Sequence, residues 1–129
     1  VLIYPIVDLT LASASIDRHA EGYLLTRSMV HWFREHYLHP EQDRRHPSPW
    51  FWTDLTGSAP AIVITAGYDP LVDEGDGYAR RLAEAGVAVR HRPYPSLIHG
   101  FLSLAGQVRA ARAATDQICA DIVELLASS

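Results

Sequence analysis

Three short, largely apolar segments constrain the fold of this chain more than any other feature. They cover residues 1–7, 61–66 and 87–92. Segments of this length without polar alternation are typical of strands buried on both faces of a parallel sheet. Pro93 and Pro95 are expected to end the third segment, which is the most polar and is therefore expected nearer a sheet edge.

Three further sets of apolar residues recur at helical spacing and predict helices between and after these strands. The first set, with Thr26 or Ser28 as N-cap, is Met29, Trp32, Phe33, His36 and Tyr37. The second set, closed by Gly86 at the C-terminus, is Val72, Ala79, Leu82 and Ala83. The third set is Val108, Ala111, Thr115, Ile118, Ile122, Leu125 and Leu126. Alternating strands and helices predict an α/β fold with three layers, α/β/α, parallel strands and right-handed crossovers.

Residues 9–60 are too long for a minimal crossover and are rich in Ser, His, Pro and aromatic residues. Excursions of this length in compact domains are often lids or binding loops, so this one is expected to line a substrate pocket. The alternative is a helix followed by a meandering surface loop.

Composition excludes several classes of protein. The net charge of -4, with acidic and basic residues interleaved, argues against nucleic-acid binding. No apolar run approaches the roughly 20 residues that cross a bilayer. Cys119 is the only cysteine, so no internal disulfide forms, which favours a reducing, cytoplasmic location.

A carboxylate and an imidazole follow two of the predicted strands. Asp69 comes just after residues 61–66, and His99 follows the next strand after a short loop of residues 95–98. Because functional groups gather at the carboxyl ends of parallel strands, we expect these side chains to meet. A Ser-His-acid triad needs this layout, in which the carboxylate orients the histidine that accepts the serine proton.

Each residue has a simpler interpretation. Asp69 before Pro70 could be only a helix N-cap, and a histidine before glycine is usually a loop residue. Asp73 is a competing carboxylate, but it suits the N-cap of the following helix. The order of the two residues in the chain and their positions after strands together favour a catalytic role for Asp69 and His99.

The sequence resembles the hormone-sensitive-lipase-like esterases at these positions. Residues 67–75, Gly-Tyr-Asp-Pro-Leu-Val-Asp-Glu-Gly, resemble the family's acid-bearing segment, and residues 99–101, His-Gly-Phe, resemble its histidine turn. Residues 2–5, 21–26 and 48–49 also look like that family, so the resemblance covers nearly the whole chain.

The resemblance implies a carboxylic-ester hydrolase with Asp69 as triad acid and His99 as general base. It also implies that Tyr23 and Leu24 border the acyl pocket and that Leu97 and Ile98 flank the histidine. The substrate would be a small-molecule ester, and neither a cofactor nor a metal is needed. His31, His36, His39 and His46 show no metal-ligand spacing.

The nucleophilic serine is absent from the sequence. Neither a Gly-x-Ser-x-Gly turn nor a His-Gly-Gly-Gly-type oxyanion segment occurs. Ser58 precedes its strand, Ser96 is too close to His99 in the chain, and Cys119 is expected to be a buried thiol. Since this fold orders its triad as Ser, acid, His, both elements are expected upstream of Val1.

Residues 1–129 are therefore expected to form a partial domain, inactive alone, whose first partner is its own N-terminal half. The sequence begins in the middle of an apolar strand, so we also expect self-association or aggregation through exposed sheet edges. Two other functions stay open. One is a serine peptidase of the prolyl-oligopeptidase type, and the other is a non-catalytic α/β binding module.

Overall fold

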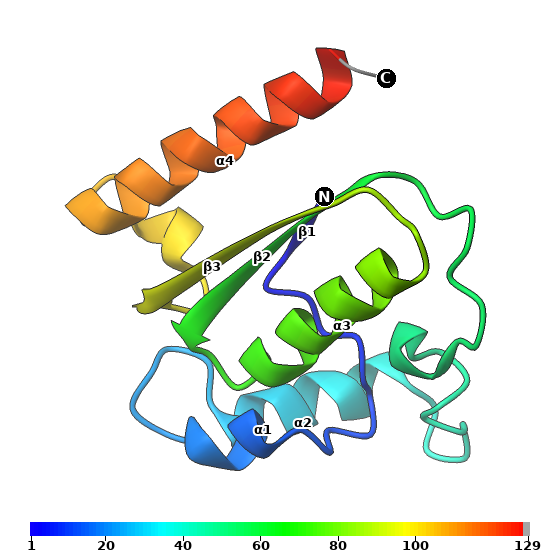
Figure 1. The fold of residues 1–129 in the computed structure, drawn as a ribbon. Coiled ribbons are helices and arrows are strands. Elements are labelled where there is room, and N and C mark those ends of the chain that lie inside the picture. The colour runs from blue at the N-terminus through cyan, green and yellow to red at the C-terminus, as the bar shows by residue number, and fades with distance from the viewer. Residues whose placement is uncertain (128–129) are drawn as a thin grey trace.

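The computed structural model describes residues 1–127 and forms a parallel sheet with helices on both faces (Figure 1). The elements are β1 (Leu2–Ile3), α1 (Ala14–Arg18), α2 (Arg27–Tyr37), η1 (Pro49–Phe51), β2 (Ala61–Tyr68), α3 (Val72–Glu84), β3 (Val89–Ile98), η2 (Phe101–Leu104) and α4 (Arg109–Ala127). The three strands run parallel in the order β1-β2-β3. The predicted α/β architecture is confirmed.

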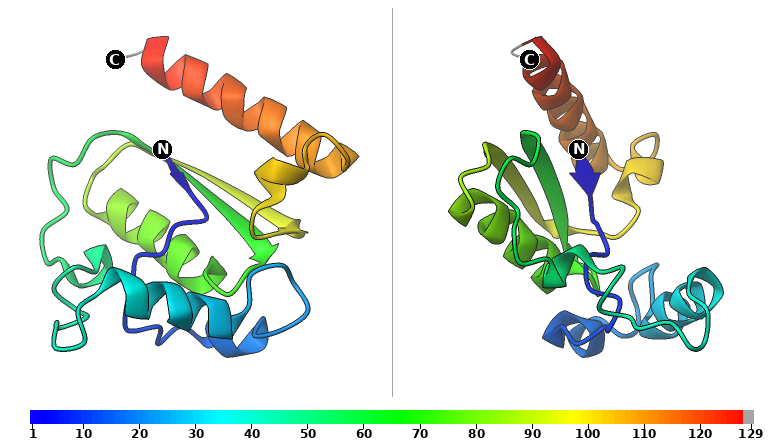
Figure 2. Two further views of the ribbon diagram at one scale, coloured as in Figure 1. Left: turned by 180° about the vertical axis from the view of Figure 1, so that it is seen from behind. Right: turned by 90° about the vertical axis from the view of Figure 1, so that its right-hand side faces the viewer.

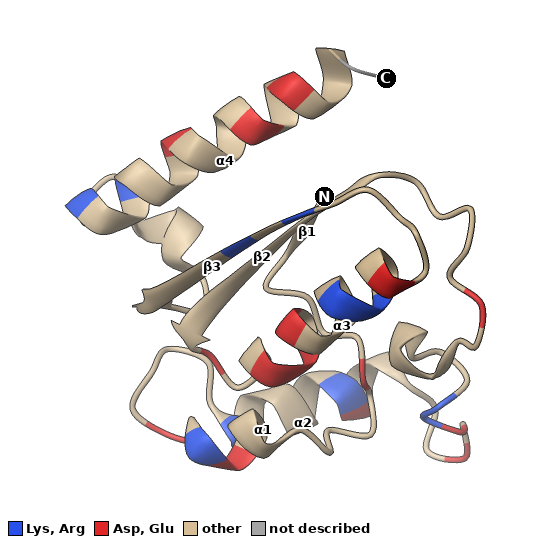
Figure 3. Cartoon of the chain, viewed as in Figure 1, with Lys and Arg blue, Asp and Glu red and all other residues tan. Residues whose placement is uncertain are grey.

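Helices α3 and α4 cover opposite faces of the sheet, whereas α1 and α2 lie beyond the end at which β2 finishes (Figure 2). Strand β2 is largely apolar because its two faces pack in two different cores. Ile62, Ile64 and Ala66 pack against α4, and Val63 packs against α3. Figure 3 shows that charged residues lie mainly on helices and loops, and that β1 and β2 carry none.

Strand β1 is much shorter than the predicted strand over residues 1–7. Tyr4 donates its N–H to the carbonyl of Ile64 at 2.7 Å and then adopts a φ of 35°, which turns the chain out of the sheet. The N–H groups of Val7 and Asp8 donate instead to the carboxylate of Glu74, at 2.7 Å and 3.0 Å. A side chain of α3 thus replaces the sheet as hydrogen-bond partner.

Strand β3 is longer than predicted, since it runs through Pro93 and Pro95 to Ile98. Within the described residues it pairs only with β2, as the predicted edge position requires. On an edge strand, alternate N–H groups point away from the neighbour, so two prolines of the same parity remove no ladder bond. The expected loop over residues 95–98 is therefore the end of the strand.

Helix α2 begins as predicted but turns a different face inward. Thr26 is its N-cap, with Oγ1 accepting from the N–H of Met29 at 3.3 Å. Val30 and Arg34 are its buried residues. Met29, Trp32, Phe33 and Tyr37, which form the apolar face predicted from the sequence, are 40–75% exposed. Arg34 can lie on the buried face of α2 because its guanidinium binds the carboxylate of Glu35 at 2.7 Å, and this ion pair neutralises its charge.

Three smaller features also differ from the sequence interpretation. The five-residue helix α1 was not predicted. Cys119, expected to be buried, is exposed on α4. Leu126 is also exposed rather than on the inner face of that helix. Among residues 1–127, no helix is both long and apolar enough to cross a membrane.

Candidate active site

Asp69 lies directly after β2, and each of its carboxylate oxygens has a separate partner. Its side chain is 1% exposed. Oδ1 accepts the N–H of Leu71 at 2.8 Å, which fixes the turn into α3. Oδ2 lies 2.8 Å from Nδ1 of His99. Asp69 therefore stabilises the turn before α3, although the N-cap of that helix is Leu71 rather than Asp69, and it also contacts His99.

His99 lies directly after β3, on a turn that requires a glycine. Gly100 adopts a φ of +77°, a conformation that favours glycine, and η2 follows it. The His99 side chain is 24% exposed, and its ring centroid lies 4.4 Å from that of Tyr4. Because a carboxylate only accepts hydrogen bonds, Nδ1 donates to Asp69, and Nε2 of the neutral ring is left with its lone pair.

Gly67 allows the two strands to bring these side chains together. The pairing of β2 with β3 shifts register between Ala66 and Tyr68, so Gly67 lies in an irregularity immediately before Asp69. A Cβ atom at Gly67 would lie 2.2 Å from the carbonyl oxygen of Pro95. Glycine is the one residue that tolerates so close an approach.

Asp73, the competing carboxylate, is occupied elsewhere. It lies within the first turn of α3 rather than at the N-cap, which is Leu71. Its carboxylate binds Arg18 at 2.6 Å and accepts the N–H of Ser15 at 2.9 Å. The hydrogen bond from Arg18 holds the pKa of Asp73 below its usual value. Asp73 thus joins α1 to α3, while Asp69 contacts His99.

Comparison with known proteins identifies the family to which this arrangement belongs. The model of a family described as the alpha/beta hydrolase fold matches residues 1–103. The chain is a member of the α/β-hydrolase fold family. The match covers β1 to β3 and both Asp69 and His99.

Curated relatives of this α/β-hydrolase chain include named ester hydrolases. It is 43% identical to carboxylic ester hydrolase LipN of Mycobacterium tuberculosis, over 80% of this chain and 28% of that protein. It is 37% identical to the ethyl acetate hydrolase of Pseudomonas putida, over 86% of this chain and 36% of that protein. The chain thus spans about a third of the length of these relatives.

Solved structures give the same result. An ester hydrolase from the metagenome of Lake Arreo superposes with a TM-score of 0.86 at 45% identity, covering 92% of this chain and 38% of that one. A fungal esterase from Rhizomucor miehei gives a TM-score of 0.87 at 36% identity, covering 97% and 40%. The resemblance to esterases inferred from the sequence is confirmed.

An apolar hollow of about 440 Å³ adjoins His99 in this α/β-hydrolase site. The residues that line it are Ile3, Tyr4, Pro5, Ile6, Leu25, Val30, Phe33, Leu71 and His99. The four residues proposed from the resemblance lie outside this lining. Tyr23 stacks on Tyr68 with ring centroids 4.9 Å apart, and Leu97 is buried in the core against α4. Leu24 lies against the His99 turn, 3.0 Å from where a Cβ of Gly100 would be, and Ile98 pairs with Tyr68.

The sequence analysis did not single out Tyr4, which contacts His99, or Glu74, which binds the chain leaving β1. Burial, and then the charge of Asp69, raises the pKa of Tyr4, whose ring packs against that of His99. Glu74 is 1% exposed, and burial raises its pKa to about 7. In the sequence, only its position within Asp-Glu-Gly pointed to Glu74. The burial of its side chain was not predictable, because the N–H groups that it accepts, those of Val7 and Asp8, are distant in the chain.

Replacing Glu74 by Gln should change how stability depends on pH. The folded-state pKa of about 7 lies above the ordinary value of 4.5, so the neutral form favours folding. Its contribution is complete below about pH 4.5 and is lost as the pH rises through 7, by about 3 kcal/mol in total. The glutamine side chain stays neutral. The free energy of unfolding, measured with urea at pH 5 and pH 8, should therefore decline less between these two pH values in the variant than in the wild type. Glu84→Gln, at an exposed site on the same helix, is the control. A decline as steep in Glu74→Gln as in the wild type would contradict this assignment.

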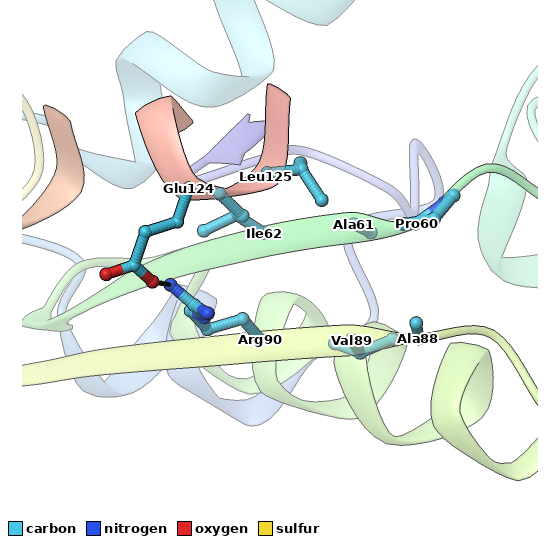
Figure 4. A pocket seen from close by; sticks show the side chains of 8 residues that line it. All are labelled: Pro60, Ala61, Ile62, Ala88, Val89, Arg90, Glu124 and Leu125. Carbon is cyan, nitrogen blue, oxygen red and sulfur yellow. Dashed lines mark hydrogen bonds and ion pairs between the residues drawn. The ribbon is translucent and has the colours of Figure 1, made fainter. Parts of the chain in front are cut away.

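A separate hollow, distant from Asp69 and His99, lies at the amino ends of β2 and β3 (Figure 4). Its charged lining residues, Arg90 and Glu124, bind each other at 2.7 Å. Arg90 and Arg92 also bind the buried Asp121 at 2.7 Å, which holds the pKa of that carboxyl below its usual range. This cluster joins α4 to β3.

In the described part of the chain, no three His, Cys, Asp or Glu side chains are grouped to hold a metal ion.

Proposed function

We propose that this chain is part of a carboxylic-ester hydrolase in which Asp69 and His99 are two members of a Ser-His-Asp triad. The observation that carries the proposal is the 2.8 Å contact between Nδ1 of His99 and Oδ2 of the buried Asp69. In the neutral ring, donation from Nδ1 leaves the lone pair on Nε2, and His99 lines an apolar hollow. Ester hydrolysis by the named relatives supports the same reaction for this chain.

The proposed mechanism passes through an acyl-enzyme. Nε2 of His99 takes the proton of a serine hydroxyl as the serine oxygen bonds to the ester carbonyl carbon. His99 then returns this proton to the departing alkoxide, which leaves as the alcohol. A water molecule, deprotonated by His99 in the same way, releases the carboxylic acid and restores the serine. Asp69 holds the ring and stabilises its protonated form.

The serine and the oxyanion-binding N–H groups are proposed to come from a segment preceding Val1. The chain contains no Gly-x-Ser-x-Gly turn, and the serine precedes the acid and the histidine in this fold. The 129 residues alone are accordingly expected to be inactive. Their carboxylate and imidazole serve a nucleophile that another part of the complete enzyme supplies.

The complete enzyme should hydrolyse p-nitrophenyl butyrate in preference to peptidyl p-nitroanilides. A fluorophosphonate probe should label one serine upstream of these residues and abolish the ester hydrolysis, with the labelled peptide identified by mass spectrometry. Preferential cleavage of the anilide would instead favour a peptidase. Absence of both activities and of labelling would favour a non-catalytic binding module.

A further inference from the structure

Ile6 and Phe33 stand between two apolar hollows. Both line the hollow beside His99, and both also line a second hollow of about 490 Å³. Ile6 follows β1, and Phe33 lies on α2 with 52% of its surface exposed. The side chains of Ile6 and Phe33 thus form a wall that is shared by the hollow beside His99 and by the second hollow.

The far walls of the second hollow are held in place by hydrogen bonds. Its lining outside α2 is formed by Ile6, Leu9, Pro47 and Pro49, and Tyr37 adds to it from α2. Ser48, fully buried between the two prolines, accepts the N–H of Leu9 at 2.8 Å. Trp50 donates its N–H to the carbonyl of Val7 at 3.0 Å. These bonds tie residues 47–50 to the chain leaving β1, so the hollow has a defined shape.

The second hollow is suited to an uncharged, apolar group. Its one charged lining residue is Arg34, whose guanidinium binds the carboxylate of Glu35 at 2.7 Å and lies 3.2 Å from Nδ1 of His31. Its charge is therefore compensated outside the hollow. The other lining groups are aliphatic, prolyl or aromatic, as an alkyl chain requires.

We infer that Ile6 and Phe33 form a barrier that limits the length of the alkyl chain of an ester bound beside His99. This inference rests on the proposed esterase function. A short chain fills the hollow that contains His99 and ends against the two side chains. Removing either one joins the two hollows, and a longer chain then extends into the space lined by Pro47 and Pro49.

The test is the chain-length profile of the complete enzyme and of its Phe33→Ala and Ile6→Ala variants. With p-nitrophenyl esters of two- to twelve-carbon acids, wild-type kcat/KM should stop rising at a short chain. In either variant the optimum should move to longer chains, with kcat/KM rising about fourfold for each further methylene that leaves water. A parallel series of alkyl butyrates distinguishes the acyl from the alkoxy chain, and a shift in either series supports the barrier.

Trp32→Ala is the matched control. Trp32 neighbours Phe33 on α2 and is similarly exposed, at 56%, but lines neither hollow. Its profile should match that of the wild type, and melting temperatures establish that all variants fold. Unchanged profiles in both Phe33→Ala and Ile6→Ala, or an equal shift in Trp32→Ala, would overturn the barrier while leaving the esterase function intact. A wild-type enzyme that hydrolyses no ester would overturn both.

Discussion

Replacing Asp69 by Asn is expected to lower kcat of the complete enzyme on p-nitrophenyl butyrate by about 10⁴-fold. An amide at this position can donate to the ring, which favours the tautomer with the proton on Nε2. His99 then cannot accept the serine proton, and its protonated form loses the charge that stabilises it. Steady-state kinetics at saturating substrate measure the loss.

The fold should survive this substitution. Oδ1 of an asparagine can still accept the N–H of Leu71, so the turn into α3 keeps its hydrogen bond. The matched control is Asp76→Asn. Asp76 also pairs with a histidine, since its Oδ1 lies 3.0 Å from Nε2 of His91, but this pair lies between α3 and the middle of β3. Near-normal kcat in Asp69→Asn, or an equal loss in Asp76→Asn, would contradict the proposed role of Asp69.

Replacing Gly67 by Ala is expected to destabilise the fold by about 3 kcal/mol and to lower activity as well. The added methyl would lie 2.2 Å from the Pro95 oxygen and 2.6 Å from its Cα, both backbone atoms that cannot rotate away. Strands β2 and β3 must therefore separate where they lead into Asp69 and His99. Lengthening the contact between these two side chains impairs proton transfer.

Urea unfolding and ester hydrolysis of the same preparation measure the two effects of this change. Gly106→Ala is the control, because nothing lies within 4 Å of a Cβ at Gly106 and its φ is not positive. That variant should keep both stability and activity. Wild-type stability in Gly67→Ala would show that the strands accommodate the methyl group and would rule out the requirement for glycine.

The sequence predicted the fold wherever one segment carried enough information by itself. Residues 61–66 are apolar on both faces because β2 lies between two cores, and such a strand is recognisable without knowledge of its neighbours. The order strand, Asp69, helix, strand, His99 predicted that the two side chains meet, and the 2.8 Å contact confirms their proximity. Their catalytic roles stay a prediction, as do the roles of Tyr23, Leu24, Leu97 and Ile98 at the pocket.

The errors arose where relations that the hydrophobic pattern does not record decide the structure. Helix α2 has two candidate inner faces, and the ion pair of Arg34 with Glu35 lets the less apolar one be buried. Pro93 and Pro95 are ordinary strand breakers, except on an edge whose outer N–H groups need no partner. The chain leaves β1 after Tyr4 because Glu74, on α3, supplies acceptors for its N–H groups. Periodicity along the sequence contains none of these relations.

The Asp69–His99 contact is assembled within residues 61–99, whereas the hollow beside it is lined mostly by residues 3–33. The two stretches are joined by the pairing of β1 with β2, by the hydrogen bonds from Val7 and Asp8 to Glu74, and by the ion pair of Arg18 with Asp73. Substitutions between β1 and β2 at positions outside these contacts should therefore change the hollow while leaving the distance between carboxylate and imidazole in place. If the proposed esterase function holds, drift at those positions would change the ester preference while selection preserved the contact between Asp69 and His99.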